Sequence, residues 1–156
     1  MFQLTSEEKL IQTFRPRDRG GMEMPPGATY PLFIRNYLAW REPSGAGVRL
    51  VFGLPGGVPT GIFFRRAHGE PGTAHMCEWC HSQGGSDQIG LLTADVNSRK
   101  RAGVNVCLDL RCQEKIEDAA NRGGRSALDA QRELLERMGQ FAREALGIDL
   151  SGAGRD

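Results

Sequence analysis

Hydrophobic residues in the first half of the chain fall into short segments that are separated by glycine and proline. Residues 48–54 form one such segment, and residues 60–66 form the next after a Pro-Gly-Gly-Val-Pro turn. Short apolar runs bounded by turn residues are typical of β-strands, so the two segments predict an antiparallel hairpin. Residues 32–40 precede this hairpin, and their apolar positions fit either a short helix or an irregular strand.

A second pair of strands is predicted further along the chain. Residues 88–96 form the first strand, a polar turn follows at residues 97–103, and residues 104–110 form the partner strand. The partner strand has an apolar residue at every second position from Val104 to Leu110. A period of two places these side chains on one face of a sheet, which predicts a second antiparallel hairpin.

Helical spacing is found near both ends of the chain. Residues 5–14 predict a short helix with two glutamates in its first turn. A longer helix begins at Ser126, which forms a capping pattern with Asp129, and ends at Gly147. Its apolar stripe comprises Leu128, Leu134, Leu135, Met138, Phe141, Ala142, Ala145 and Leu146. We expect this stripe to pack on the sheet, which gives an α+β fold of antiparallel hairpins with a long C-terminal helix.

The length and composition suit one compact domain. The chain has 156 residues, of which 39% are hydrophobic and 25% are charged. We expect an N-terminal helix and linker at residues 1–29, a single domain at residues 30–150 and a disordered tail at residues 151–156. The formal net charge of +1 excludes a polycation that coats nucleic acid. A monomer is expected.

Two features of the sequence bear on localisation. The N-terminus has no basic segment followed by an apolar one, so no secretory signal is expected. The uncharged segment at residues 50–64 is interrupted by glycines and prolines and is too short to cross a membrane. We therefore expect a soluble, cytoplasmic protein without a membrane partner. In that compartment, cysteines favour metal binding or redox chemistry over disulfides.

Four cysteines supply the strongest chemical signal in the chain. Cys77 and Cys80 form a C-x2-C pair, and Cys107 and Cys112 form a C-x4-C pair after the second hairpin. Four thiolates in a tetrahedron are a typical set of structural zinc ligands. The order of a C-x2-C knuckle, a hairpin, the second cysteine pair and a helical segment is that of a treble-clef zinc finger. We therefore expect one structural Zn²⁺ bound by all four cysteines.

Alternative interpretations of the first cysteine pair remain open. His81 follows Cys80 and could replace one cysteine as a ligand. The C-x-x-C-H spacing also matches c-type haem attachment, although this interpretation leaves the second cysteine pair unexplained. A redox dithiol is a third alternative, but a segment rich in glycine and serine follows the pair where such a motif would open a helix. His68 and His75 are interpreted as ordinary loop histidines.

The sequence contains none of the common catalytic motifs. It has no G-x-S-x-G, no P-loop and no G-x-G-x-x-G after a strand. We therefore expect a binding protein and not an enzyme.

Four segments resemble a known family when they are taken in order. They are Phe63–Arg66, Cys77–His81, Leu91–Ala94 and Val104–Cys112. Together they resemble the treble-clef zinc-finger domain of the elongation factor G-binding proteins, which include the fusidic-acid-resistance proteins. The resemblance spans roughly residues 30–120 and does not include the N-terminal helical domain of the resistance proteins.

The resemblance implies a non-enzymatic zinc protein that binds elongation factor G and affects its association with the ribosome. It carries the zinc ligands over to Cys77, Cys80, Cys107 and Cys112. Individual contacts with the partner do not carry over from the family.

Three functions are weighed. The first is binding of elongation factor G through the basic tip Arg99, Lys100 and Arg101 of the second hairpin. The tip equally fits a solvated turn. Trp79 could add a contact, although a core position is favoured for it. The second function is a zinc finger that binds the ribosome or its RNA through the same tip. Further arginines would contact the RNA, and an aromatic residue would stack on a base; they are Arg15, Arg17, Arg19, Arg65 and Arg66, with Trp79 or Tyr37 for stacking. The third is a thiol redox or metal-sensing protein.

Overall fold

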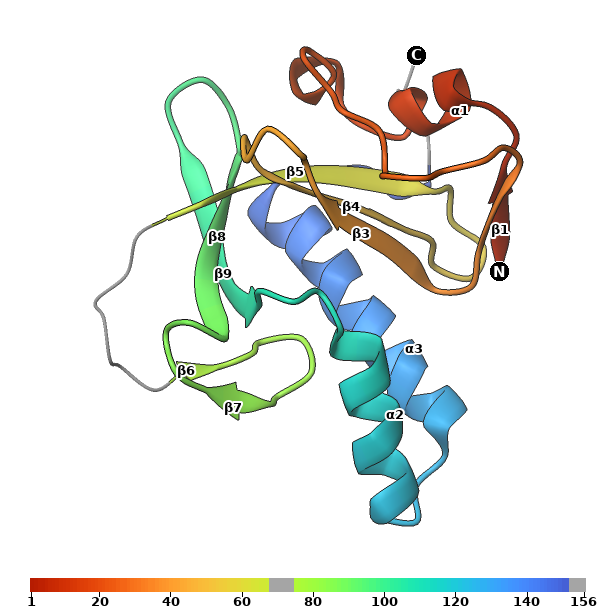
Figure 1. Cartoon of the computed structure of the whole chain (residues 1–156), viewed down its shortest axis with the longest axis vertical. Coiled ribbons are helices and arrows are strands. Elements are labelled where there is room, and N and C mark those ends of the chain that lie inside the picture. Colours follow the sequence, from red (N-terminus) through yellow and green to blue (C-terminus); the bar gives the residue numbers. More distant parts are fainter. Residues whose placement is uncertain (68–74, 152–156) are drawn as a thin grey trace.

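A five-stranded antiparallel sheet forms the centre of the protein (Figure 1). The structure is a computed structural model, and it describes residues 1–67 and 75–151. The strand order is β3-β4-β5-β8-β9. The strands are β3 (Tyr37–Arg41), β4 (Val48–Phe52), β5 (Thr60–Arg66), β8 (Ile89–Asp95) and β9 (Arg101–Cys107).

Both hairpins predicted from the sequence are confirmed. β4 pairs with β5, where Val48 lies opposite Phe64, and β8 pairs with β9 over the full length of both strands. The second turn is shorter than the expected 97–103, because β9 begins at Arg101 and ends at Cys107. The connections place the two hairpins next to each other in one sheet, since β5 also pairs with β8.

The segment at residues 32–40 is extended, so the helical alternative for it is wrong. Leu32–Ile34 forms β2, and Tyr37–Arg41 forms β3 at the edge of the central sheet. β2 pairs with β1 (Phe2–Leu4) in a separate two-stranded sheet that the sequence did not indicate. Its three-residue strands are too short to carry a recognisable period.

Two helices cover the inner face of the sheet, and together they confirm the α+β class. They are α2 (Cys112–Arg122) and α3 (Ala127–Gln140), and α3 continues into the π-helical turn η2 (Phe141–Ala145). Phe64 of β5 packs against Phe141 at a ring distance of 5.8 Å. In the described parts of the chain, no helix is both long and apolar enough to span a membrane.

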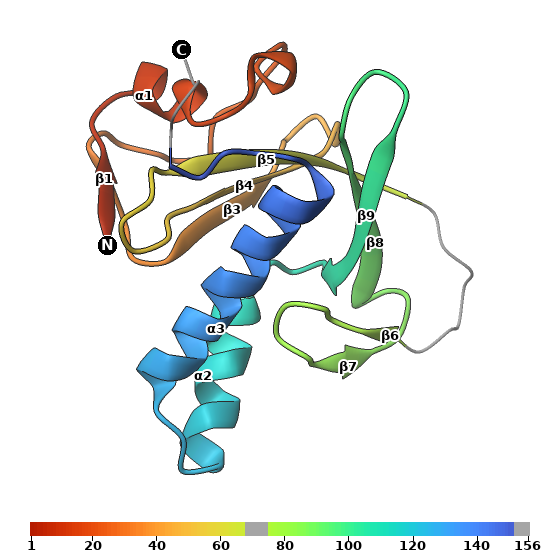
Figure 2. The ribbon, with the colours of Figure 1, turned by 180° about the vertical axis from the view of Figure 1, so that it is seen from behind.

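Leu128 of the predicted apolar stripe is exposed and does not lie in the core. Leu128 is 57% exposed, whereas Leu134, Leu135 and Met138 are buried. Figure 2 shows the reason, since α2 and α3 lie side by side and extend beyond the sheet at the end where α3 begins. Leu128 lies in the first turn of α3 and therefore has no sheet residue to pack on.

The N-terminal segment forms a second layer on the outer face of the sheet. It contains α1 (Glu7–Gln12) and the short 3-10 helix η1 (Pro16–Asp18). Ser6 caps α1, and Phe14 packs with Trp40 and other buried residues in a core separate from the main one. This layer covers β3 to β5, and Met22 and Met24 of the expected linker pack against its core.

Candidate metal centre

The first cysteine pair lies in a tight turn between two very short strands. These strands are β6 (His75–Met76) and β7 (Gln83–Gly84), which pair antiparallel on either side of the cysteines. The Cys77 N–H donates to the Ser82 carbonyl at 2.8 Å, and the Cys80 N–H donates to the Cys77 sulfur at 3.4 Å. An amide that donates to a sulfur favours the thiolate form, which is the form that binds metal.

The second cysteine pair connects the central sheet to a helix. Cys107 is the last residue of β9, and Cys112 is the first residue of α2. Between them, Leu110 takes a left-handed conformation with φ 63°, and its N–H donates to the Cys107 carbonyl at 3.2 Å. The positive end of the α2 dipole lies at Cys112 and favours a negative thiolate there.

The four sulfur atoms converge on one point. All four Sγ atoms lie within 4.8 Å of one another, with Cys77 to Cys112 at 3.6 Å and Cys80 to Cys107 at 3.5 Å. A zinc ion with four sulfur ligands at ~2.3 Å requires sulfur–sulfur edges of about 3.8 Å. A disulfide would require about 2.05 Å, and all four cysteines are free. Four sulfur ligands at these separations therefore fit one zinc ion.

Histidines do not enter this cluster. The group of close donors consists of the four cysteines, and His81 lies outside it as an exposed residue. His75 lies in β6, and His68 falls outside the described residues. Among the described residues, the donor atoms therefore match a site with four cysteine ligands and no histidine.

The thiols influence one another strongly when no cation is present. A hydrogen bond with Cys107 lowers the pKa of the Cys80 thiol, and the same neighbour lowers the pKa of Cys77 to about 7. The hydrogen bond with Cys107 raises the pKa of the Cys112 thiol. Four thiolates at this distance repel one another, so complete ionisation requires a dication in their centre.

A lysine adds positive charge beside the cluster. Lys115 forms an ion pair with Asp109 at 2.9 Å, and Asp109 also accepts from the Arg111 N–H at 3.0 Å. Burial lowers the pKa of Lys115, but hydrogen bonds with Asp109 and the Cys107 sulfur outweigh this effect and raise the pKa above its usual value. A cation near the sulfurs offsets part of the double negative charge that zinc with four thiolates carries.

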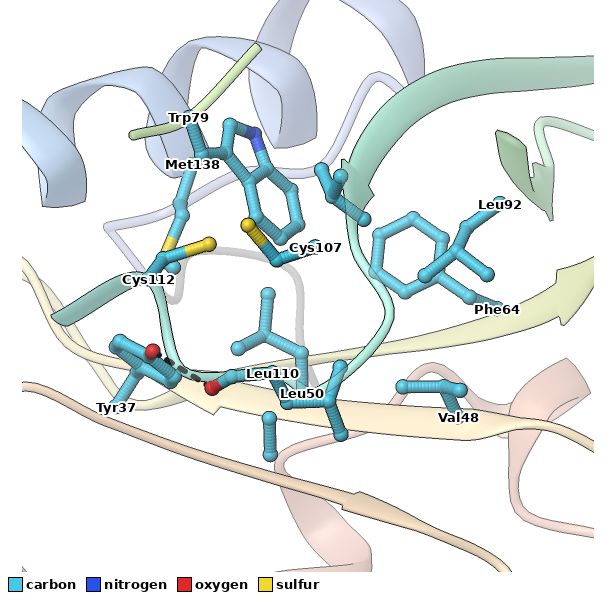
Figure 3. Close-up of a pocket in the computed structure, with 12 residues that line it drawn as sticks. Tyr37, Val48, Leu50, Phe64, Trp79, Leu92, Cys107, Leu110, Cys112 and Met138 are labelled. Atoms are coloured by element: carbon cyan, nitrogen blue, oxygen red, sulfur yellow. Dashed lines mark hydrogen bonds between the residues drawn. The ribbon is translucent and has the colours of Figure 1, made fainter. Parts of the chain in front are cut away.

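A tyrosine from the sheet fixes the second cysteine loop. The Tyr37 hydroxyl donates to the Leu110 carbonyl at 2.9 Å, as the dashed line in Figure 3 shows, and accepts from the Gln113 N–H at 3.1 Å. Gln113 is the second residue of α2, whose N–H has no partner within the helix. Burial raises the pKa of Tyr37, so its hydroxyl stays protonated and can donate.

Two arginines each donate a hydrogen bond to a backbone carbonyl in one of the two cysteine loops. Arg41 of β3 donates to the Leu108 carbonyl, and Arg137 of α3 donates to the Trp79 carbonyl. Each cysteine loop is thereby tied to an element of the main fold. No local pattern marks Tyr37, Arg41 or Arg137 in the sequence, since their partners lie far away along the chain.

Trp79 and the hairpin tip differ in their exposure. Trp79 is 6% exposed and packs against Phe64 at a ring distance of 5.9 Å. It therefore lies in the core beside Cys107 (Figure 3). Little of its side chain is therefore left for contact with a partner. Arg99, Lys100 and Arg101 are all exposed, and only Arg101 forms an ion pair, with Asp95 at 3.2 Å.

Two cysteines in a knuckle, with two more at the end of a hairpin and the start of a helix, define a treble-clef zinc finger. The chain belongs to the family described as the FBP C-terminal treble-clef zinc-finger, whose sequence profile matches residues 8–146. The family and its clustered cysteines support one structural Zn²⁺. The family resemblance found in the sequence is thus confirmed.

A solved structure shares this fold. It is described as the structure of the fusidic acid resistance protein FusC, and it matches with a TM-score of 0.54 at 15% sequence identity. The match covers 90% of this chain but only 57% of FusC, so the chain spans little more than half the length of that protein. A comparison with curated protein sequences gave no significant match.

Proposed function

We propose that this protein is a zinc-stabilised, non-enzymatic binding protein whose partner is translation elongation factor G. The observation that carries the proposal is the family match over residues 8–146 together with the cluster of four cysteines. The family resemblance supplies the partner, and FusC, which shares the fold, is described as a fusidic acid resistance protein. The proposal concerns binding and an effect on the ribosome association of the factor, and it does not extend to resistance.

The metal acts through folding in this proposal. Cys77, Cys80, Cys107 and Cys112 are the proposed ligands. Four thiolates complete a tetrahedral zinc site, so the ion would supply structural cross-links between the knuckle, β9 and α2. Its binding free energy would add to the folding free energy of this half of the protein.

A groove beside the knuckle suits a protein partner. Its volume is about 290 Å³, and Trp79 and Val104 form its buried floor. Phe141 and Ala145 of η2 are half-buried along one side. The polar rim consists of Glu78, Arg137, Gln140 and Glu144. An apolar centre within a polar rim is the usual anatomy of a protein interface, and its two glutamates favour a partner segment that carries basic residues.

A pair of matched variants tests this groove. Ala145→Arg places a long charged side chain at the groove wall without removing any core atom, and Ala119→Arg makes the same change at an exposed position of α2 outside the groove. We expect the first variant to weaken binding of elongation factor G at least tenfold in a fluorescence anisotropy titration. The control variant should bind as tightly as the unmodified chain.

Equal affinities for the two variants would contradict the groove as the contact surface. Absence of binding by the unmodified, zinc-loaded chain would contradict the proposed function itself. The thermal midpoints of both variants, measured by circular dichroism, separate a blocked groove from a damaged fold.

A further inference from the structure

Cations without acidic partners gather at one end of the central sheet. Arg17, Arg65, Arg99 and Lys100 are all exposed, and within residues 1–67 and 75–151 none of them forms an ion pair. Unpaired cations are strongly hydrated and repel one another, so a cluster of them at one place is a feature that an anionic partner would stabilise.

The strand register places Arg65 beside the second hairpin. Arg65 lies opposite Thr93 of β8, and Thr93 lies opposite Gly103 of β9. Leu92 and Val104, the next residues along β8 and β9, are buried in the main core. Successive side chains of a strand point to opposite faces, so Arg65 and Thr93 point to the outer face. The outer face of β8 and β9 therefore carries a cation at its β5 side.

The N-terminal layer brings another cation to the same end. Arg15 donates to the carbonyl of Asp95, the last residue of β8, and also pairs with the buried Asp18. These contacts hold η1 against the base of the hairpin turn, and Arg17 projects from η1 as an exposed residue. Figures 1 and 2 both show η1 and the β8–β9 turn at the same end of the molecule.

This surface lacks the anchors of a protein interface. The outward side chains of β8 are Leu91, Thr93 and Asp95, and those of β9 are Arg101 and Asn105, while Gly103 has none. Asp95 is paired with Arg101 at 3.2 Å, so the pair adds no net charge between Arg65 and the hairpin tip. Protein partners usually bind through buried aromatic or large apolar anchors, whereas nucleic-acid backbones bind through cations that contact phosphates. The surface thus differs from the groove beside the knuckle, which has an apolar floor.

We propose that the outer face of β8 and β9, together with the hairpin tip, binds the backbone of double-stranded RNA. RNA duplexes present a wide and shallow minor groove with 2′-hydroxyls and flanking phosphates, which suits a surface of small and polar side chains edged by cations. Arg65 and the β9 edge of this face lie roughly 10 Å apart across two strand spacings. The site is separate from the proposed contact with elongation factor G and does not depend on it.

The test compares two double variants of the full, zinc-loaded chain. Arg99→Gln with Lys100→Gln removes two charges from the tip. Arg122→Gln with Arg132→Gln removes two charges from exposed residues of α2 and α3 that have no ion pair in the described part of the chain. Both variants lose the same net charge. The probes are a labelled RNA duplex of about two helical turns and a DNA duplex of the same sequence, each measured by fluorescence anisotropy at several salt concentrations.

We expect the unmodified chain and the control variant to bind the RNA duplex with a salt slope of about −4, one for each of four phosphate contacts. The tip variant should bind at least tenfold more weakly, with a slope of about −2. Absence of RNA binding, or equal binding by the two variants, would overturn the proposal. Equal affinity for the DNA duplex would overturn the assignment to RNA.

Two further measurements distinguish the proposed RNA site from the proposed site for elongation factor G. The tip variant should bind elongation factor G normally, and Ala145→Arg should bind RNA normally. If the tip variant instead loses elongation factor G and the unmodified chain does not bind RNA, the surface belongs to the protein partner and the proposal is wrong.

Discussion

Tyr37 shows how single residues outside the cysteine motifs hold the metal centre. Its hydroxyl links the edge strand β3 to the Leu110 carbonyl and to the Gln113 N–H at the start of α2. These two backbone groups lie on either side of Cys112. The position of this ligand therefore depends on a hydrogen bond from the sheet, in the way that outer residues commonly orient metal ligands.

Replacing Tyr37 with phenylalanine should destabilise the protein by about 1–3 kcal/mol, because two backbone groups lose a partner in a mostly buried place. The matched control is Tyr30→Phe, since the Tyr30 hydroxyl contacts only the Met24 sulfur at 3.6 Å among the described hydrogen bonds. That control should change the free energy of unfolding by less than about 0.5 kcal/mol. Urea denaturation measures both values, and equal losses in the two variants would contradict the role given to Tyr37.

Cys107→Ser removes one of the four proposed ligands. We expect bound zinc to fall from one ion per chain to substoichiometric levels, and the thermal midpoint to fall by about 10 °C, because metal binding contributes to folding. Ser98→Ala at the exposed hairpin turn serves as a control and should retain both properties. Atomic absorption and calorimetry measure the two quantities. A variant with an unchanged midpoint would show that zinc does not stabilise this half.

The cysteine cluster also predicts a pH dependence. Without metal, the hydrogen bond with Cys107 raises the pKa of Cys112, so a proton competes with zinc for that sulfur. The metal-free sulfur therefore binds a proton throughout the neutral range, and zinc affinity and the stability linked to it should fall steadily as the pH is lowered. Titration with a chromogenic zinc chelator at several pH values measures this trend. Affinity that is constant or rises on acidification would contradict it.

At the level of elements, the fold depends on close packing between the N-terminal layer and the sheet. Phe14 lies over Gly61 of β5, where a Cβ atom would come within 2.7 Å of the ring. Arg49 of β4 is fully buried beneath this layer, where it pairs with Glu42 at 3.3 Å and donates to the Asp18 carbonyl. The aromatic ring and the buried charge both require the layer to remain in place.

Gly61→Ala should therefore cost about 1–3 kcal/mol of stability, because the added methyl group forces the Phe14 ring or the strand to shift. Gly20→Ala provides the control, since a Cβ there meets nothing within 4 Å. Chemical denaturation of both variants gives the comparison. If Gly61→Ala were as stable as the control, the layer would not be packed as described.

The elements that the sequence predicted are those with a period long enough to recognise. Both hairpins, the N-terminal helix and the long helix from Ser126 follow their hydrophobic patterns, and the positive φ at Gly147 ends that helix as expected. The strands β1, β6 and β7 have only two or three residues, so tertiary contacts and not periodicity define them. Leu128 matched the helical period but lies beyond the sheet, because a period identifies a face and not what covers it.

The candidate metal site was predictable for a different reason. The spacing of Cys77, Cys80, Cys107 and Cys112 is itself the signal, and the structure brings their sulfurs together. The supporting residues Tyr37, Arg41 and Arg137 could not be predicted, since each acts on a carbonyl in a distant segment. The burial of Trp79 likewise depends on Phe64 and the helices, which a local motif does not specify.

The whole molecule has two hydrophobic cores that are stabilised in different ways. The larger core joins the sheet, the helices and the cysteine loops, and the smaller core joins the N-terminal layer to the outer face. Ligation of one zinc ion would stabilise the first, whereas the second depends on packing and a buried ion pair. The groove beside the knuckle is the proposed site for a protein partner, and the basic face at the second hairpin is the proposed site for RNA.

The most direct test of this account is a calorimetric titration of the zinc-loaded chain into elongation factor G from the same source, repeated with the Cys107→Ser variant. We predict saturable binding with one chain per factor for the zinc-loaded protein and no measurable heat for the variant. The absence of heat with the zinc-loaded protein, together with the absence of co-migration on gel filtration, would contradict the proposed function and leave the treble-clef fold in place.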